Sequence, residues 1–189
     1  MIIKVIPNGE IQENCYILTL EGRDDAILID PGSEPEKIKM ELGTKKVVAT
    51  LLTHGHWDHT GALMSFAEAP LYMHEEDLPL LKSTRFKFGD FDQELSPRPE
   101  PTDFVRDGQV LKLAGITLQV MHTPGHTPGG VCYVAGDDVF TGDTIFDGDY
   151  GRTDLPGGSM QQMRQSLRKI LALHGLYAHP GHGNSFIIP

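Results

Sequence analysis

Histidine and aspartate are concentrated in short glycine-bracketed stretches, three of which follow predicted strands, and any fold of this chain must bring these strand ends together. The apolar run VVATLL predicts a strand buried on both faces, and THGHWDHTG follows it directly. The alternating strand ITLQVM leads into HTPGHTPGG, the strand at 138–141 leads into GDT, and HPGHGN comes last. The ligand-type residues of these stretches are His54, His56, Asp58, His59, His126, Asp143 and His182. Because a rigid scaffold aims side chains placed at strand ends, we expect these residues to form one site.

Imidazole nitrogen and carboxylate oxygen are the ligands that zinc and similar divalent ions take in proteins. A single histidine in a chain with 9 of them is usually a surface or core residue, but four ligand-type residues within positions 54–59 favour a metal site. Five His and two Asp can give each of two ions about three or four protein ligands if one carboxylate bridges. We therefore expect two divalent metal ions, zinc in the first place, with iron or manganese compatible with the same ligands.

The motifs, in their order, resemble those of the metallo-β-lactamase superfamily, and within it the glyoxalase II (hydroxyacylglutathione hydrolase) branch. The matching pieces are HGHWDH at 54–59, TPGHTPG at 123–129, TGDT at 141–144, GRTD at 151–154 and PGHG at 180–183, with DPG at 30–32 and NCY at 14–16. The resemblance spans nearly the whole chain but does not include the C-terminal helical domain with which classical glyoxalase II contacts glutathione. We therefore expect a short form with a single metal-dependent hydrolase domain at residues 1–189.

The resemblance implies a ligand set for each ion and one bridging carboxylate: His54, His56 and His126 for the first ion, Asp58, His59 and His182 for the second, and Asp143 as the bridge. Asp58, a ligand next to the nucleophile, is the candidate catalytic residue that orients it or takes its proton. Lactamases proper carry Cys or lack the bridging acid where Asp143 stands. The diiron oxygen and nitric oxide reductases carry an acid where His56 stands, so both positions favour the glyoxalase II branch.

Arg152 is the candidate substrate-binding residue. Counted from GDT, it stands where glyoxalase II carries a lysine that contacts glutathione, and Asp154 stands where that family has an aromatic residue. A guanidinium suits a planar carboxylate through a bidentate contact. The alternative is that Arg152 and Asp154, two residues apart in a loop, form a structural ion pair.

The predicted function is thioester hydrolysis of S-(2-hydroxyacyl)glutathione, such as S-lactoylglutathione, or of a related small thioester, by a metal-bridging hydroxide. Coordination brings the pKa of water from 15.7 towards about 7, and a thiolate with a pKa of about 8.5 leaves without a dedicated general acid. A first alternative is an iron-dependent glutathione persulfide dioxygenase, a class that resembles this chain as far as GRTD and holds one iron with two His and one carboxylate, here His54, His126 and Asp143. A second alternative is a metal-bearing protein of other specificity.

The pattern of predicted elements is that of an α+β protein. Strands are expected at 2–6, 16–20, 26–29, 47–52, 71–73, 110–113, 116–121, 131–135 and 138–141, and helices at 33–43, 62–67, 74–82 and 159–175. Ser33 with Glu36, and Ser159 with Gln162, form the expected capping boxes. Many strands with interspersed helices predict two packed sheets with helices outside, a four-layer αββα sandwich.

The segment 83–101 is the one irregular stretch, and it allows two interpretations. Its contents are three phenylalanines (Phe86, Phe88 and Phe91), three prolines and the cations Arg85, Lys87 and Arg98. It is either a loop that covers the metal site and grips an anionic substrate or a surface crossover whose phenylalanines pack on the core.

The composition of the chain limits which partners it can bind and in which cellular compartment we expect it. A formal net charge of -10 argues against a nucleic-acid partner, which would need a basic face. The start MIIKVIPNGE has no signal-peptide apolar region and no stretch approaches the roughly 18 apolar residues of a membrane span, so we expect a cytoplasmic enzyme without a membrane partner. Cys15 and Cys132 lie in apolar strand contexts, which predicts buried free thiols.

Overall fold

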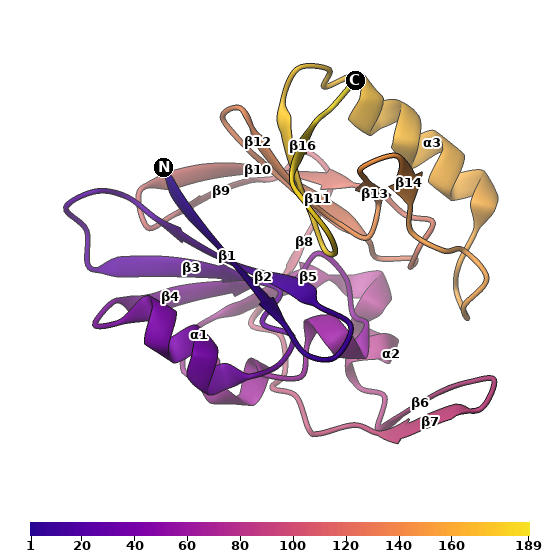
Figure 1. Ribbon diagram of the computed structural model, residues 1–189, viewed down its shortest axis with the longest axis horizontal. Coiled ribbons are helices and arrows are strands. Elements are labelled where there is room, and N and C mark those ends of the chain that lie inside the picture. Colours follow the sequence, from indigo (N-terminus) through magenta and orange to yellow (C-terminus); the bar gives the residue numbers. More distant parts are fainter.

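Two six-stranded sheets face each other in the computed structural model, which describes residues 1–189 (Figure 1). The first sheet has the order β1-β2-β3-β4-β5-β8, and pairing is antiparallel among β1 to β3 and parallel from β3 to β8. Its strands are β1 (Ile2–Asn8), β2 (Glu13–Thr19), β3 (Asp25–Ile29), β4 (Lys46–Leu51), β5 (Leu71–His74) and β8 (Asp103–Val105).

The second sheet has the order β16-β15-β12-β11-β10-β9, and only β12 and β15 pair in parallel. Its strands are β9 (Val110–Leu113), β10 (Ile116–His122), β11 (Val131–Ala135), β12 (Asp138–Gly142), β15 (Tyr177–Pro180) and β16 (Phe186–Ile187). Two hairpins stand apart from the sheets: β6 (Arg85–Phe88) with β7 (Phe91–Glu94), and β13 (Ile145–Phe146) with β14 (Asp149–Tyr150).

Side chains point alternately to the two faces of each strand, and they form a central core between the sheets and two outer cores. On β2, Tyr16 and Leu18 enter the core between the sheets, whereas Cys15 and Ile17 face the other way. In β-strands successive side chains point to opposite faces, so a strand buried throughout must be covered on both sides. All seven residues of β2 are buried, which places this strand in the interior of a layered fold.

Helices cover the outer faces of both sheets (Figure 1). Ile38 and Leu42 of α1 (Pro35–Leu42) pack with the outward residues of the first sheet, and Ile170 of α3 (Met160–Leu171) packs on the second. A single helical turn, α2 (Leu78–Leu81), packs beside the first sheet after the 3-10 turn Glu75–Asp77. These layers confirm the αββα sandwich.

Local details of the helices differ in part from the predictions. Ser159 Oγ accepts a hydrogen bond from the Gln162 amide at 3.3 Å, as expected for the start of α3. The capping box predicted for α1 is wrong, because Ser33 Oγ donates to Asn8 Oδ1 instead and the helix begins after Glu34, whose φ is 47°. The predicted helix at 62–67 is a 3-10 turn, Leu63–Phe66.

The segment 83–101 is not irregular throughout, since its first half is the β6–β7 hairpin, which projects from the body of the molecule (Figure 1). Cys15 and Cys132 are buried free thiols, as predicted. None of the helices combines the length and the apolar character that a membrane crossing requires.

Candidate metal centre

The seven predicted ligands come from loops at strand ends of both sheets and meet at one place. His54, His56, Asp58 and His59 follow β4 in the first sheet. The other three follow strands of the second sheet: His126 comes after β10, Asp143 after β12 and His182 after β15. The site therefore lies at the seam between the two sheets.

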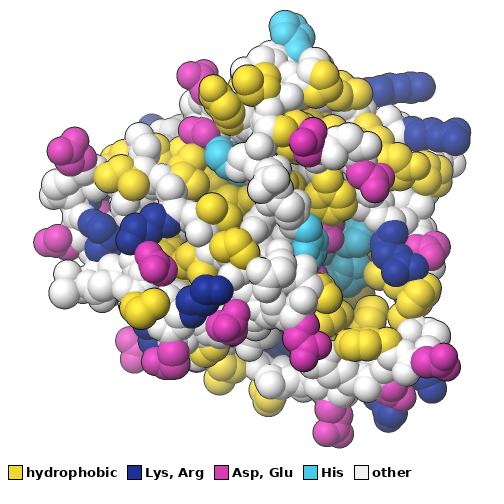
Figure 2. All heavy atoms as spheres, viewed as in Figure 1, with side chains coloured by type: hydrophobic (Ala, Val, Ile, Leu, Met, Phe, Trp, Pro, Cys, Tyr) yellow, Lys and Arg dark blue, Asp and Glu magenta, His cyan; other side chains and the backbone are white.

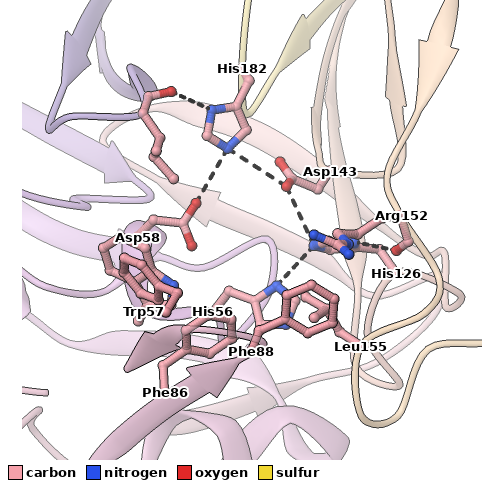
Figure 3. A pocket seen from close by; sticks show the side chains of 12 residues that line it. His56, Trp57, Asp58, Phe86, Phe88, His126, Asp143, Arg152, Leu155 and His182 are labelled. Atoms are coloured by element: carbon pink, nitrogen blue, oxygen red, sulfur yellow. Dashed lines mark hydrogen bonds and ion pairs between the residues drawn. The ribbon is translucent and has the colours of Figure 1, made fainter. Parts of the chain in front are cut away.

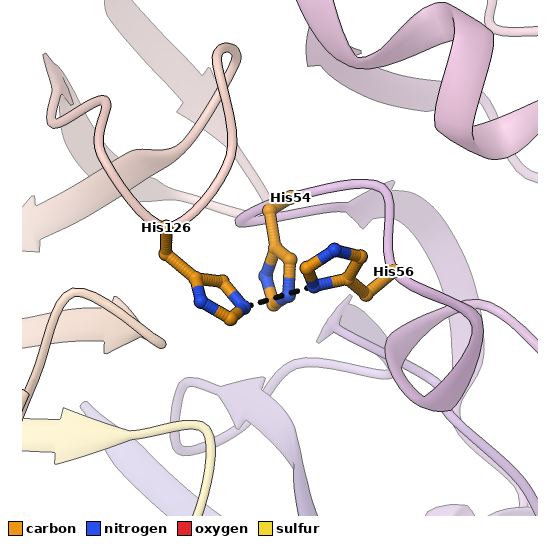
Figure 4. A group of neighbouring side chains, drawn as sticks. All are labelled: His54, His56 and His126. Atoms are coloured by element: carbon orange, nitrogen blue, oxygen red, sulfur yellow. Dashed lines mark hydrogen bonds between the residues drawn. The ribbon is translucent and has the colours of Figure 1, made fainter. Parts of the chain in front are cut away.

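The first cluster consists of His54, His56 and His126, whose ligand atoms lie within 4.8 Å of one another (Figure 4). The His56 Nδ1 and the His126 Nε2 face each other at 2.8 Å. Burial lowers the pKa of His54 well below its ordinary value, and burial together with the neighbouring His126 lowers that of His56 to about 3. These two rings are therefore neutral near pH 7, which is the form that binds metal ions.

The second cluster consists of Asp58, His59 and His182. The Asp58 Oδ2 lies 3.5 Å from the His59 Nε2 and 3.3 Å from the His182 Nε2. Burial alone would raise the pKa of the Asp58 carboxyl, but His59 and His182 outweigh it and lower the pKa. Asp58 is thus a carboxylate between two imidazoles.

Asp143 lies between the two clusters. Its Oδ1 is 3.4 Å from the His59 Nε2, and its Oδ2 is 3.4 Å from the His126 Nε2 and 3.7 Å from the His182 Nε2. Burial would raise the pKa of this carboxyl, yet the surrounding imidazoles, His59 first, lower it well below its usual range. A carboxylate that reaches members of both clusters has the position of a bridge.

Residue 181 must be a glycine, because its backbone passes close to the Asp143 carboxylate. A Cβ on Gly181 would meet the His59 Cε1 at 2.7 Å and would also collide with the Asp143 Oδ1. The glycine of the sequence PGHG thus allows the loop that carries His182 to approach the other ligands.

Hydrogen bonds fix the tautomers of four of the five histidines. The Nδ1 atoms of His54, His59, His126 and His182 face the Thr53 hydroxyl, the Asp30 carboxylate, the Arg152 carbonyl and the Ile11 carbonyl, respectively. Since the Thr53 hydroxyl donates to Asp30 at 2.5 Å, it can only accept from His54. Each of these rings therefore holds a proton on Nδ1 and turns its Nε2 towards the centre as the atom available to a metal ion.

The donor set fits divalent metal ions. Three atoms at the centre are buried without a hydrogen-bond partner: the Nε2 of His54, the Nε2 of His59 and the Oδ1 of Asp143. A buried polar atom without a partner costs about 1–3 kcal/mol, and a bound cation removes this cost for nitrogen and carboxylate ligands. The two clusters and Asp143 can hold one or two such ions.

Two buried aspartates hold the ligand loops, and only one has a sequence signal. Asp30, of the DPG motif, has a φ of 51° and accepts from the Thr53 amide at 2.7 Å as well as from His59. Asp77 accepts from the Gly55 amide at 2.9 Å, the Gly129 amide at 2.6 Å and the Thr127 hydroxyl at 2.7 Å. Asp77 therefore joins the loop of the first motif to the loop of the second, but its run HEED resembles a solvated surface in the sequence.

The NCY motif holds the loop of the last ligand. The Asn14 Nδ2 donates to the carbonyls of Pro180 and Gly183 at 3.0 and 2.8 Å, and the Tyr16 hydroxyl donates to Pro180 at 2.6 Å. Next to it, Glu13 is buried with no hydrogen-bond partner for either carboxylate oxygen and lies 3.7 Å from the His59 Nδ1. Burial raises the pKa of Glu13 well above its usual value.

Arg152 has separate main-chain and side-chain contacts. Its carbonyl accepts from His126 at 2.7 Å, while its guanidinium makes a bidentate pair with Asp154, 2.7 Å in both contacts, and lies 4.2 Å from the centre of the Phe88 ring. The ion pair considered from the sequence is thus formed, at the border of the pocket that a substrate would enter.

A pocket of about 360 Å³ opens onto the ligands (Figure 3). Its lining residues are Ile11, His56, Trp57, Asp58, Phe86, Phe88, Phe91, His126, Asp143, Arg152, Leu155 and His182. On the surface, histidine side chains lie in a hollow next to hydrophobic side chains (Figure 2). The phenylalanines of the segment 83–101 thus border the metal site, as the first interpretation of that segment expected.

The anion-gripping part of that interpretation is wrong, because none of the segment's cations lines the pocket. Arg85 pairs with Asp92, Lys87 lies 3.7 Å from the same carboxylate, and Arg98 donates to the Thr60 hydroxyl and the Ser83 carbonyl.

Two histidines that stand close to ligand motifs in the sequence, His122 and His179, lie outside the ligand set. His122 stacks on His74 with ring centres 4.2 Å apart, and its Nε2 donates to the Pro128 carbonyl. His179 bonds to Asp138 and Ser185.

Comparison with known proteins agrees with this geometry. Residues 8–182 match the family model described as "Metallo-beta-lactamase superfamily". The hydroxyacylglutathione hydrolase GloC of Haemophilus influenzae is 35% identical over 97% of this chain and 92% of its own length, and the probable metallo-hydrolase YqgX of Bacillus subtilis is 35% identical over 94% and 88%.

Solved structures give the same result. BLEG-1, described as a B3 metallo-β-lactamase, has a TM-score of 0.90 at 30% identity and covers 99% of this chain and 94% of its own. TTHA1623 in a di-iron-bound form has a TM-score of 0.82 at 34% identity over 98% and 94%. ETHE1 from Myxococcus xanthus has a TM-score of 0.76 at 26% identity over 100% and 80%.

Proposed function

The chain belongs to the metallo-β-lactamase superfamily, whose members are mostly metal-dependent hydrolases, and we propose that it is a thioester hydrolase acting on S-(2-hydroxyacyl)glutathione or a related small thioester. The observation that carries the proposal is the pair of ligand clusters with Asp143 between them. This set suits two ions, in accord with the di-iron-bound form of TTHA1623, and the proposed reaction follows the name of GloC, a hydroxyacylglutathione hydrolase.

Bound divalent ions would supply a water of lowered pKa as nucleophile and would polarise the scissile carbonyl. The chain's own contribution is to hold the five imidazoles in place, four of them in a fixed tautomer, and to keep Asp58 beside the reacting atoms. Asp58 is the residue that we assign to orienting the nucleophile or taking its proton.

The titratable side chains that line the pocket favour a substrate whose leaving group departs without being protonated. Of the six titratable residues in the lining, five belong to the ligand set, and the sixth is Arg152. A guanidinium keeps its proton at neutral pH, so outside the ligand set the lining offers no side chain to protonate a poor leaving group such as an amine. A thiolate leaves without that help, which supports a thioester over a peptide amide.

A glutathione persulfide dioxygenase is the second candidate, and the similarity to ETHE1 supports it. One iron held by His54, His126 and Asp143 would serve that reaction. The second cluster disfavours it, because Asp58, His59 and His182 would then have no metal to hold.

One set of measurements on one preparation separates these functions. Protein purified without added metal would be analysed for metal content and assayed for hydrolysis of S-lactoylglutathione and of a β-lactam, and for oxygen uptake with glutathione persulfide. Thioester hydrolysis with two ions per chain supports the proposal. Oxygen uptake with a single iron and no hydrolysis would replace it with the dioxygenase.

A further inference from the structure

The β6–β7 hairpin has one aromatic and one charged face. Strand pairing places Phe88 opposite Phe91 and Lys87 opposite Asp92, and Phe86 and Phe88 alternate with the charged residues of β6. The aromatic side chains line the metal pocket, whereas Arg85 and Lys87 lie on the other face with Asp92. The hairpin is therefore oriented with its apolar face towards the metal centre.

Trp57 connects this face to the ligands. Its ring lies 5.8 Å from Phe91 in a stacked arrangement and 6.0 Å from Phe86, and those two rings are 5.8 Å apart. In the sequence Trp57 stands between His56 and Asp58, so its ring contacts with the hairpin lie directly beside residues of both ligand clusters (Figure 3). We refer to Trp57, Phe86, Phe88 and Phe91 as the aromatic wall.

The aromatic wall leaves apolar surface in water. Phe88 is 40% and Phe91 47% exposed, although both border the same pocket. The one cation in the lining, Arg152, is paired with Asp154. Beyond the metal ligands, the pocket thus offers a partner mainly for an apolar group.

We propose that the aromatic wall binds an apolar acyl substituent of the thioester, so that the enzyme prefers an aryl or branched acyl group to a methyl group. The reacting carbonyl must lie at the ligands, and a substituent of a few atoms on that carbonyl reaches the wall beside Asp58. This inference deepens the proposed thioester hydrolysis and rests on it for the reaction, but the binding preference can be measured without turnover.

The binding test compares two thioethers that cannot be hydrolysed, S-benzylglutathione and S-methylglutathione, on metal-loaded protein. Both compounds carry the same glutathione peptide, so any contact of this peptide with Arg152 contributes equally to the two affinities. Trp57 is the only tryptophan of the chain, so its fluorescence reports binding at the aromatic wall, and calorimetry gives the affinities. We expect the benzyl compound to bind about 10- to 100-fold more tightly, as the burial of a phenyl ring against aromatic side chains requires.

Two variants locate the preference. Phe86→Ala combined with Phe91→Ala should remove most of it, whereas Lys87→Ala, on the opposite face of the same hairpin, should retain it. Equal affinity of the two thioethers for the unmodified protein would overturn the inference, whatever the variants do.

The kinetic test compares S-mandeloylglutathione with S-lactoylglutathione. The double Phe variant should lose about 10-fold or more in kcat/KM for the mandeloyl thioester and stay within about 3-fold for the lactoyl thioester, since only the former reaches the wall. An equal loss on both would contradict the inference and leave thioester hydrolysis standing. No hydrolysis of either, with a retained preference for S-benzylglutathione, would refute the proposed function and leave the apolar subsite.

Discussion

The backbone carbonyl of Arg152 accepts a hydrogen bond from the His126 Nδ1 at 2.7 Å, so a residue that borders the pocket also orients a candidate metal ligand. The two roles use different atoms. A substitution of the side chain leaves the carbonyl in place, which allows substrate binding and metal binding to be separated by mutation.

We expect Arg152→Ala to raise KM for S-lactoylglutathione by about 10- to 150-fold, the loss of one charged hydrogen-bond partner, with unchanged metal content. Asp154→Asn should lower KM, because it releases the guanidinium from its present partner. Steady-state kinetics on this thioester and on a neutral one test both changes. If both variants instead slow both substrates alike, the pair has a structural role.

Asp143→Ala should reduce the metal content well below two ions per chain, because its two oxygens face ligands of both clusters. The control is His174→Ala, which removes an exposed histidine that belongs to no group of neighbouring ligand-type side chains. Elemental analysis after dialysis gives the stoichiometry. Equal metal content in the two variants would show that Asp143 is not a bridge.

Asp77→Ala should lower the free energy of unfolding by about 3 kcal/mol, since it leaves two amides and a hydroxyl without their buried acceptor. Asp90→Ala, at the exposed turn of the β6–β7 hairpin, is the matched control and should change it little. Urea unfolding of metal-free protein measures the difference. A similar stability of the two variants would rule out Asp77 as the connection between the ligand loops.

The metal-free protein should lose stability through His56 as the pH falls. Burial lowers the pKa of His56 to about 3 in the folded chain against 6.5 in the unfolded one, so between these values only the unfolded chain takes up the proton. Between pH 7 and pH 5 this amounts to about 2 kcal/mol. His56→Asn should lack this part of the pH dependence, and parallel profiles for the two proteins would contradict the assignment.

The meeting of the seven candidate ligands at one place was predictable because their chemistry and their spacing coincide in the sequence. His54, His56, Asp58 and His59 follow an apolar strand within six positions, and His126 and Asp143 follow two other predicted strands, so the topology had little freedom in where to place them. The strand before His182, β15, was not among the predicted ones. The layers were predictable for a similar reason, since alternation on strands such as β2 records which face is buried.

The residues that hold the ligand loops in place were harder to predict from the sequence, because their role depends on contacts with residues far away in the chain. Asp77 bonds to Gly129, 52 residues away, and nothing near it in the sequence indicates burial. The hairpin at 85–94 was missed because the two faces of RFKF become distinct only when its partner strand is in register. At the start of α1, Ser33 had two possible partners, and the tertiary contact with Asn8 prevailed over the local cap.

The position of the centre at the seam has a kinetic consequence. Each cluster takes ligands from the loops of both sheets: His126 joins His54 and His56, and His182 joins Asp58 and His59. An ion held in this way spans the two halves of the molecule, so the sheets cannot separate while it remains fully coordinated. Loss of the ions should therefore precede the opening of the interior, and amides of the central strands should exchange with solvent no faster than the ions leave.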